Sequence, residues 1–134
     1  MNDTANEALA APSPHILLVD DEEDILPEFQ ELLELEGLDS AICADPQRAV
    51  GMVLAQPNLR VVVTDLRMAK LDGASLIRSL RSTLPAARHV EFIILTGDSS
   101  SHAGDDIAGI PVFIKPADIE GLVAAIRSAL APNQ

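Results

Sequence analysis

Aromatic and sulfur-containing side chains are scarce in this sequence. Its 134 residues include three Phe, no Trp, no Tyr and a single cysteine, Cys43. A lone cysteine can form neither an intramolecular disulfide nor a metal site built from several cysteines, and it is typical of a reducing compartment. Because Cys43 lies in an apolar stretch, we interpret it as a small core residue. The shortage of aromatic rings also removes the stacking platforms that single-strand nucleic-acid binders use.

Long hydrophobic runs are absent as well. No segment approaches the roughly 18 uninterrupted apolar residues that a membrane span needs. Residues 1–14 carry two acids, no Lys or Arg and no apolar run, so they lack the pattern of a signal peptide. We therefore expect a cytoplasmic protein without membrane insertion. Its organisation should be a flexible tail at residues 1–14, one domain over residues 15–131 and a short tail at residues 132–134.

Basic residues are missing from the first third of the chain. Residues 1–47 hold thirteen of the 21 acids and no Lys or Arg, whereas residues 48–134 hold the other eight acids and all nine bases. The formal net charge of −12 repels phosphate backbones, so direct nucleic-acid binding is not expected. Four of the acids are spaced as the solvent face of the first predicted helix: Asp24, Glu28, Glu31 and Glu34.

Strand and helix patterns alternate about five times along the chain. Short apolar runs predict buried strands at residues 16–19, 38–44, 60–64, 90–95 and 111–114. Apolar residues at helical spacing predict four helices, with inward stripes of Ile25, Phe29, Leu32 and Leu33; Ala49, Val50, Val53 and Leu54; Leu76, Ile77, Leu80 and Leu84; and Ile119, Leu122, Val123, Ile126 and Leu130. The stretch between Leu95 and Pro111 has scarcely any stripe, so the helix expected there is short or frayed. Such alternation indicates an α/β fold, a parallel sheet with helices on both faces.

Residues suited to phosphoryl or metal chemistry mark the ends of four predicted strands. Asp20 and Asp21 follow the first strand, Asp65 the third and Lys115 the fifth, and Thr96 ends the fourth. Each residue alone is explained as a turn former, a cap or a solvated charge. The carboxyl ends of parallel strands meet at one sheet edge, however, where three crowded carboxylates should repel, raise at least one pKa and need a cation. Oxygen ligands suit Mg²⁺, so the set predicts a phosphoryl site with a metal and an ammonium group.

Four motifs stand in order along the chain: LLVDDEED, VVVTDLRMAKLDG, ILTGD and FIKPAD. Together they resemble the receiver domain of two-component response regulators over about residues 15–131. The resemblance implies a flavodoxin-like, doubly wound five-stranded sheet of order 2-1-3-4-5. It implies that Asp65 accepts the phosphoryl group and that Lys115 and Thr96 contact it. The Mg²⁺ ligands that it implies are the carboxylates of Asp20, Asp21 and Asp65 and the backbone carbonyl of Arg67.

The resemblance also implies partners. Receivers take their phosphoryl group from a histidine kinase or a histidine phosphotransfer protein, and they signal to a downstream protein by contact or by phosphorelay. The chain would then be a switch that catalyses only its own phosphorylation and dephosphorylation. Two alternatives remain open: an aspartyl-nucleophile phosphohydrolase that uses Mg²⁺, and a non-phosphorylated module that only binds partners. Hydrolases of the haloacid dehalogenase type have Asp-x-Asp, but the second residue after Asp65 is Arg67.

Several positions depart from the receiver pattern. Ala69 stands where proline is usual, four residues after the acceptor, which should leave that loop less rigid. Val112 stands where a switch aromatic is usual, and Phe113 beside it should point to the other face of the sheet. Activation should therefore not be read through an aromatic rotamer.

The Lys115–Pro116 bond would be the cis peptide of the family, since bonds before proline adopt cis at modest cost.

Residues at the mouth of the site should modulate the lifetime of the phosphorylated state. In receivers this lifetime depends on the residues two after the acceptor and two after the threonine, here Arg67 and Asp98, with Gly97 beside the threonine. Two arrangements remain open: the opposite charges pair across the mouth of the site, or both side chains point into solvent. A pair at such a partly exposed position is worth only ~0–1 kcal/mol. Such a pair would obstruct water by its position and so slow the loss of the phosphoryl group.

Overall fold

Five parallel strands form the centre of the fold, in the order β2-β1-β3-β4-β5, which confirms the predicted topology. The structure, a computed structural model, describes residues 14–97, 109–115 and 119–131. The strands are β1 (Ile16–Val19), β2 (Ser40–Cys43), β3 (Val61–Thr64), β4 (Glu91–Thr96) and β5 (Val112–Ile114). The central strands β1 and β3 are buried along their whole length, because helices cover the sheet on both sides.

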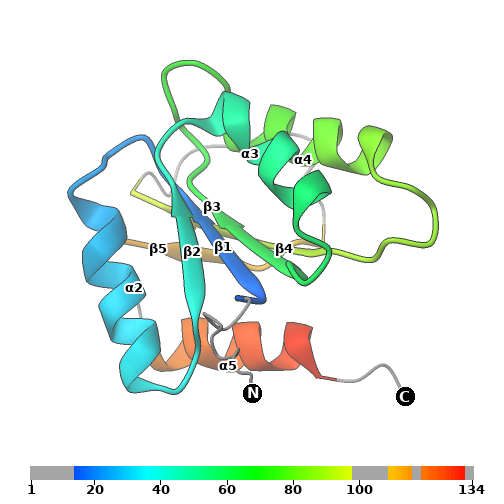
Figure 1. Ribbon diagram of the computed structural model, residues 1–134. Coiled ribbons are helices and arrows are strands. Elements are labelled where there is room, and N and C mark those ends of the chain that lie inside the picture. The colour runs from blue at the N-terminus through cyan, green and yellow to red at the C-terminus, as the bar shows by residue number, and fades with distance from the viewer. Residues whose placement is uncertain (1–13, 98–108, 116–118, 132–134) are drawn as a thin grey trace, which may run out of the picture.

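Two pairs of helices cover the two faces of this sheet (Figure 1). They are α2 (Ile25–Leu35), α3 (Pro46–Ala55), α4 (Gly73–Thr83) and α5 (Ile119–Leu130). One core, which includes Leu17 and Val62, lies under α3 and α4, and the other, which includes Leu18 and Val63, lies under α2 and α5. Successive residues of β1 and β3 thus enter opposite cores, which explains their unbroken apolar sequences. Among the described residues, no helix combines the length and the apolar character that crossing a membrane requires.

Two residues of the predicted helix stripes turn outward instead. Leu32 is 37% exposed and Leu54 is 43% exposed. On α2 the residues that reach the core are Leu26, Phe29 and Leu33, spaced i, i+3 and i+7. The inward stripe is therefore narrower than predicted, and Leu26 takes the place predicted for Ile25. Apart from Leu54 on α3, the residues of the other three stripes pack into the two cores as predicted. The short fourth helix predicted between Leu95 and Pro111 falls mainly on residues 98–108, outside the described residues.

The turn between α2 and β2 shortens the second strand relative to the prediction. Gly37 adopts φ +79°, and its N–H donates to the Glu34 carbonyl over 2.9 Å. The N–H of Leu38 donates to the Leu33 carbonyl over 2.9 Å, which completes a Schellman-type helix end. Leu38 therefore belongs to the end of the helix, and pairing with β1 begins only at Ser40.

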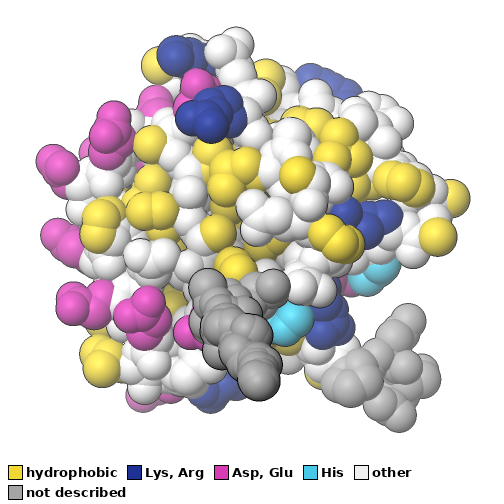
Figure 2. Space-filling view, in the orientation of Figure 1, with side chains coloured by type: hydrophobic (Ala, Val, Ile, Leu, Met, Phe, Trp, Pro, Cys, Tyr) yellow, Lys and Arg dark blue, Asp and Glu magenta, His cyan; other side chains and the backbone are white. Residues whose placement is uncertain are grey.

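The acidic residues of α2 face solvent. Asp24, Glu28, Glu31 and Glu34 are all exposed, as their spacing predicts. Figure 2 shows acidic side chains gathered on the side of the molecule that α2 occupies in Figure 1. Cys43 lies on the opposite face of the sheet, 6% exposed within the core under α3 and α4, which confirms its interpretation as a core residue.

Candidate functional site

Asp65 is held at the end of β3 by contacts on both of its sides. Its N–H donates to the Val19 carbonyl over 3.0 Å, which keeps the strand end beside β1. Its Oδ1 accepts the N–H of Leu66 over 2.7 Å. The residue is 7% exposed. The Leu66 N–H therefore orients a carboxylate that has little access to water.

Lys115 places its ammonium group among the carboxylates. Its N–H donates to the Thr96 carbonyl over 2.8 Å, which continues the β4–β5 pairing. Its Nζ lies 2.5 Å from Asp20 Oδ2, 3.4 Å from Asp65 Oδ2 and 3.8 Å from Glu22 Oε1. Only 13% of the lysine side chain is exposed, so a largely buried cation links the ends of β1, β3 and β5.

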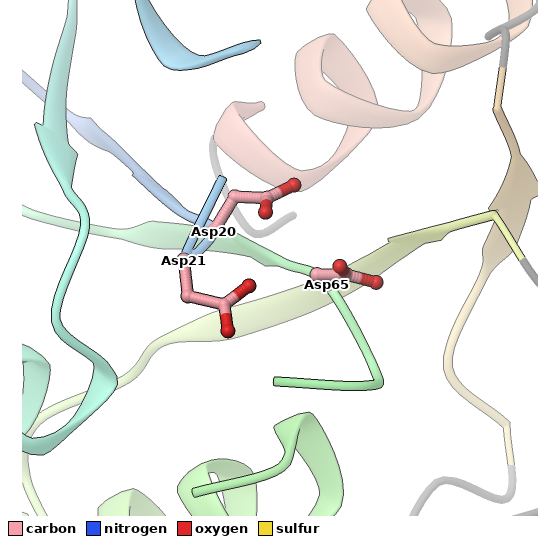
Figure 3. Close-up of side chains that lie close together, drawn as sticks. All are labelled: Asp20, Asp21 and Asp65. Atoms are coloured by element: carbon pink, nitrogen blue, oxygen red, sulfur yellow. The ribbon is translucent and has the colours of Figure 1, made fainter. Parts of the chain in front are cut away.

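Three carboxylates converge beside this lysine, as the sequence predicts. Figure 3 shows Asp20 and Asp21, which follow β1, beside Asp65. One carboxylate oxygen from each of the three lies within 4.8 Å of the others. Asp20 Oδ1 accepts the N–H of Glu22 over 2.9 Å, and Asp21 Oδ2 accepts the N–H of Ala69 over 2.8 Å. Neighbouring backbone amides thus orient both carboxylates.

Burial raises the pKa of Asp65. Removal of the carboxylate from water is the largest cause, and the negative charge of Asp20 adds to it. The charge of Lys115 and the hydrogen bond from Leu66 oppose the rise without cancelling it. The expected rise in a carboxyl pKa is therefore present, but mutual repulsion is its lesser cause. The pKa of Lys115 is also raised: burial acts to lower it, but the hydrogen bond and charge of Asp20 and the charge of Asp65 outweigh burial.

The donor set fits a magnesium ion. Three carboxylates with ligand atoms within 4.8 Å of one another supply the hard oxygen ligands that Mg²⁺ prefers, and one ammonium balances only part of their charge. Asp20 and Asp65 are buried and Asp21 is half-buried, so a bound ion would remain open to water and to a phosphoryl oxygen on one side. Bound there, Mg²⁺ would neutralise charge on a phosphoryl group.

The remaining predicted residues lie around this cluster. Thr96 ends β4 and is 2% exposed, and Gly97 follows it at the surface. Arg67 is exposed in the loop after Asp65, while Asp98, with which a pair was one of the two open arrangements, lies outside the described residues. The cis peptide expected before Pro116 also lies outside them.

The last strand alternates as predicted. Val112 is 45% exposed, whereas Phe113 packs into the core under α2 and α5. Two contributors were not predicted from the sequence, Glu22 beside the lysine and the amide of Ala69. Glu22 lies within the LLVDDEED motif, where its acidic side chain two residues after Asp20 was a usable signal.

Gly73 fixes how closely α4 approaches the site. Its N–H donates to the Leu66 carbonyl over 2.8 Å. A Cβ at this position would lie 2.3 Å from the carbonyl oxygen of Asp65 and 3.0 Å from the Cα of Leu66. Both obstacles are backbone atoms, so a side chain at residue 73 would displace the loop that carries Asp65.

We therefore expect Gly73→Ala to lower the free energy of unfolding by about 1–3 kcal/mol, the usual cost of forcing extra atoms into a filled site. Urea denaturation measures this change. Gly51→Ala is the matched control, because nothing lies within 4 Å of a Cβ there and residue 51 is inside α3. This control should gain roughly 0.5–1 kcal/mol from the better helix former. Equal stability of the two variants would contradict the tight contact at Gly73.

Comparison with known proteins places the sequence and the fold of this chain in one family. A sequence model described as the response regulator receiver domain matches residues 16–127. The transcriptional regulatory protein YkoG of Bacillus subtilis is 34% identical over 122 residues, which cover 89% of this chain and 52% of YkoG. The chain thus spans about half the length of that curated relative.

Solved structures agree with the sequence comparison. The signal receiver domain of an HD domain-containing protein from Pseudomonas fluorescens superposes with a TM-score of 0.75 at 28% identity, covering 89% of this chain and 95% of that one. A response regulator receiver domain protein from Clostridium thermocellum gives a TM-score of 0.72 at 30% identity, covering 87% and 94% of the two chains. With the family match spanning most of its length, the chain belongs to the response regulator receiver domain family.

Proposed function

We propose that this chain is a phosphorylation switch that works with Mg²⁺. Asp65 takes a phosphoryl group from the phosphohistidine of a histidine kinase or a histidine phosphotransfer protein, and the product signals by partner binding or onward transfer. The observation that carries the proposal is the convergence of three carboxylates, two of them in contact with one largely buried ammonium group, at the carboxyl edge of the sheet. A cation beside paired carboxylates is the arrangement that phosphoryl transfer needs.

The two oxygens of Asp65 have different surroundings, and we infer a different role for each. The Leu66 N–H holds Oδ1, while Oδ2 faces the Lys115 ammonium at 3.4 Å. Oδ2 is therefore the oxygen that forms the new bond to phosphorus, as the phosphorus–nitrogen bond of phosphohistidine breaks and the imidazole leaves. The hydrogen bond to Oδ1 restricts rotation of the carboxylate, which lowers the entropic cost of the transfer.

Lys115 is positioned to follow the charge as it moves. Before transfer its ammonium group is shared by Asp20 and Asp65. After transfer, Asp65 loses its carboxylate charge and the phosphoryl oxygens carry the negative charge beside it, so the same ammonium contacts them. Asp20, Asp21, Asp65 and the carbonyl of Arg67 would hold Mg²⁺. The hydroxyl of Thr96, at the end of β4 beside β5, supplies a further donor to the phosphoryl oxygens.

The direct test uses a small phosphodonor. Incubation of the chain with acetyl phosphate and Mg²⁺ should add the mass of one phosphoryl group, because the donor set requires the metal to offset the carboxylates. The intact mass, measured with Mg²⁺ and again with EDTA, reports the transfer.

The two alternatives give different outcomes in this experiment and in a parallel assay with a small phosphomonoester. Steady turnover of a small phosphomonoester would indicate a phosphohydrolase. An unchanged mass in saturating Mg²⁺ would indicate a module that only binds partners, and either result would overturn the proposal. Labelling that survives EDTA would remove the metal from the mechanism.

A further inference from the structure

A backbone amide ties the loop between β3 and α4 to the acidic cluster. The Ala69 N–H donates to Asp21 Oδ2 over 2.8 Å and joins residues 48 positions apart in the sequence. The same loop begins with the bond from Leu66 to Asp65 Oδ1 and ends with the bond from Gly73 to the Leu66 carbonyl. One short loop therefore touches two of the three clustered carboxylates through main-chain donors.

This contact with Asp21 depends on which residue occupies position 69. Proline is usual at this position of the receiver pattern, and proline has no N–H to donate. The alanine side chain is exposed, so its methyl group has no packing role in the core. The backbone donor is the contribution that alanine makes at this position and proline would not.

The Ala69 amide contacts Asp21, the one carboxylate of the cluster that the Lys115 ammonium group does not contact. Lys115 lies against Asp20, Asp65 and Glu22. Asp21 is half-buried and receives the Ala69 amide on Oδ2, which leaves Oδ1 for another ligand. Figure 3 shows the carboxyl groups of Asp20 and Asp21 pointing to opposite sides, with Asp65 to the right of both.

We propose that Ala69 is a positioning residue for Mg²⁺. Its amide orients the Asp21 carboxylate and ties the loop that carries Arg67 to this carboxylate. The inference rests on the proposed function, since it concerns the affinity of the same site for Mg²⁺. Hydrogen-bond partners of metal ligands act in this way because they fix ligand orientation before the metal arrives.

Mg²⁺ binding by three variants at position 69 tests the proposal. We expect Ala69→Pro to bind Mg²⁺ about tenfold more weakly than wild type, the lower end of the loss seen for outer partners of metal ligands. Ala69→Ser and Ala69→Gly keep the amide, so their dissociation constants should match wild type. Isothermal titration with MgCl₂ gives the constants, and melting in EDTA shows whether each variant is folded. Equal or tighter binding by Ala69→Pro would overturn the role of the amide.

Hydrogen exchange on the wild-type chain gives a second reading that needs no proline variant. The Ala69 amide should exchange slowly, and saturation with Mg²⁺ should keep or increase its protection. Asp21→Ala should abolish this protection. Loss of protection on adding Mg²⁺ would mean that the metal displaces the amide, which contradicts positioning.

The results also separate this inference from the proposed function. If wild type binds no Mg²⁺, the metal part of the proposed function fails and the positioning role fails with it. If wild type binds Mg²⁺ and accepts a phosphoryl group while Ala69→Pro binds Mg²⁺ equally well, only the positioning role is lost.

Discussion

Asp65→Asn is expected to abolish phosphoryl transfer from acetyl phosphate to this chain. The amide keeps the size of the side chain, and its oxygen can still accept the Leu66 N–H that Asp65 Oδ1 accepts at 2.7 Å. It lacks the anionic oxygen that faces Lys115, so no nucleophile remains to form the bond to phosphorus. The intact mass after incubation with Mg²⁺ should therefore stay unchanged, whereas wild type gains one phosphoryl group.

Asp24→Ala is the matched control for this experiment. Asp24 is an exposed aspartate before α2 whose side chain makes no capping hydrogen bond, so labelling should be that of wild type. Folding is checked by melting in EDTA. Burial raises the pKa of Asp65, so its carboxylate costs stability at neutral pH and the asparagine variant should melt no lower than wild type. Undiminished labelling of Asp65→Asn would move the acceptor to another residue.

The sheet was predictable from the sequence because its strands have an unambiguous composition. Val61 to Thr64 is a β-branched run that enters both cores, and only a strand covered on both faces combines such residues with full burial. The boundary at Leu38 was not predictable from hydrophobicity. That leucine closes α2 through backbone hydrogen bonds, and its apolar side chain suits the helix end and the strand start equally well.

The composition of the site was likewise predictable, whereas its contacts were not. Parallel strands bring their carboxyl ends to one edge, so Asp20, Asp65 and Lys115 had to converge once the strands were known. Which carboxylate takes the lysine depends on side-chain geometry within a few ångströms. The amide of Ala69 is a main-chain group, and no side-chain pattern signals a main-chain donor.

Removal of the buried ammonium group by Lys115→Met should destabilise the metal-free fold strongly. Asp20 and Asp65 have side chains only 7% and 8% exposed, and the lysine is the cation beside both. Breaking a buried ion pair by removing one partner typically costs about 3–5 kcal/mol, because the remaining charge is neither solvated nor paired. Urea denaturation at neutral pH in EDTA should show a loss of this size.

The loss should grow as the pH rises. The folded-state pKa of Asp65 is already raised above its ordinary value of 3.8, and loss of the ammonium group raises it further. A carboxyl group with a raised folded pKa favours folding below its unfolded pKa and loses that contribution as pH rises through the folded pKa. The free energies of unfolding of wild type and Lys115→Met should therefore differ least near pH 4 and most near pH 7. Near pH 7 the difference should reach the full loss expected for breaking the ion pair.

An exposed lysine provides a control that removes one positive charge without breaking a buried ion pair. Lys70 lies 3.8 Å from Asp45 with 62% of its side chain exposed, so Lys70→Met removes the same formal charge at a cost of ~0–1 kcal/mol. The double variant Lys115→Met with Asp65→Asn should recover part of the lost stability, because one of the two uncompensated carboxylates is gone. Such recovery would show that the lysine acts through Asp65 as well as Asp20. If Lys115→Met unfolds at the same urea concentration as Lys70→Met across this pH range, the ammonium group is not the buried partner of these carboxylates.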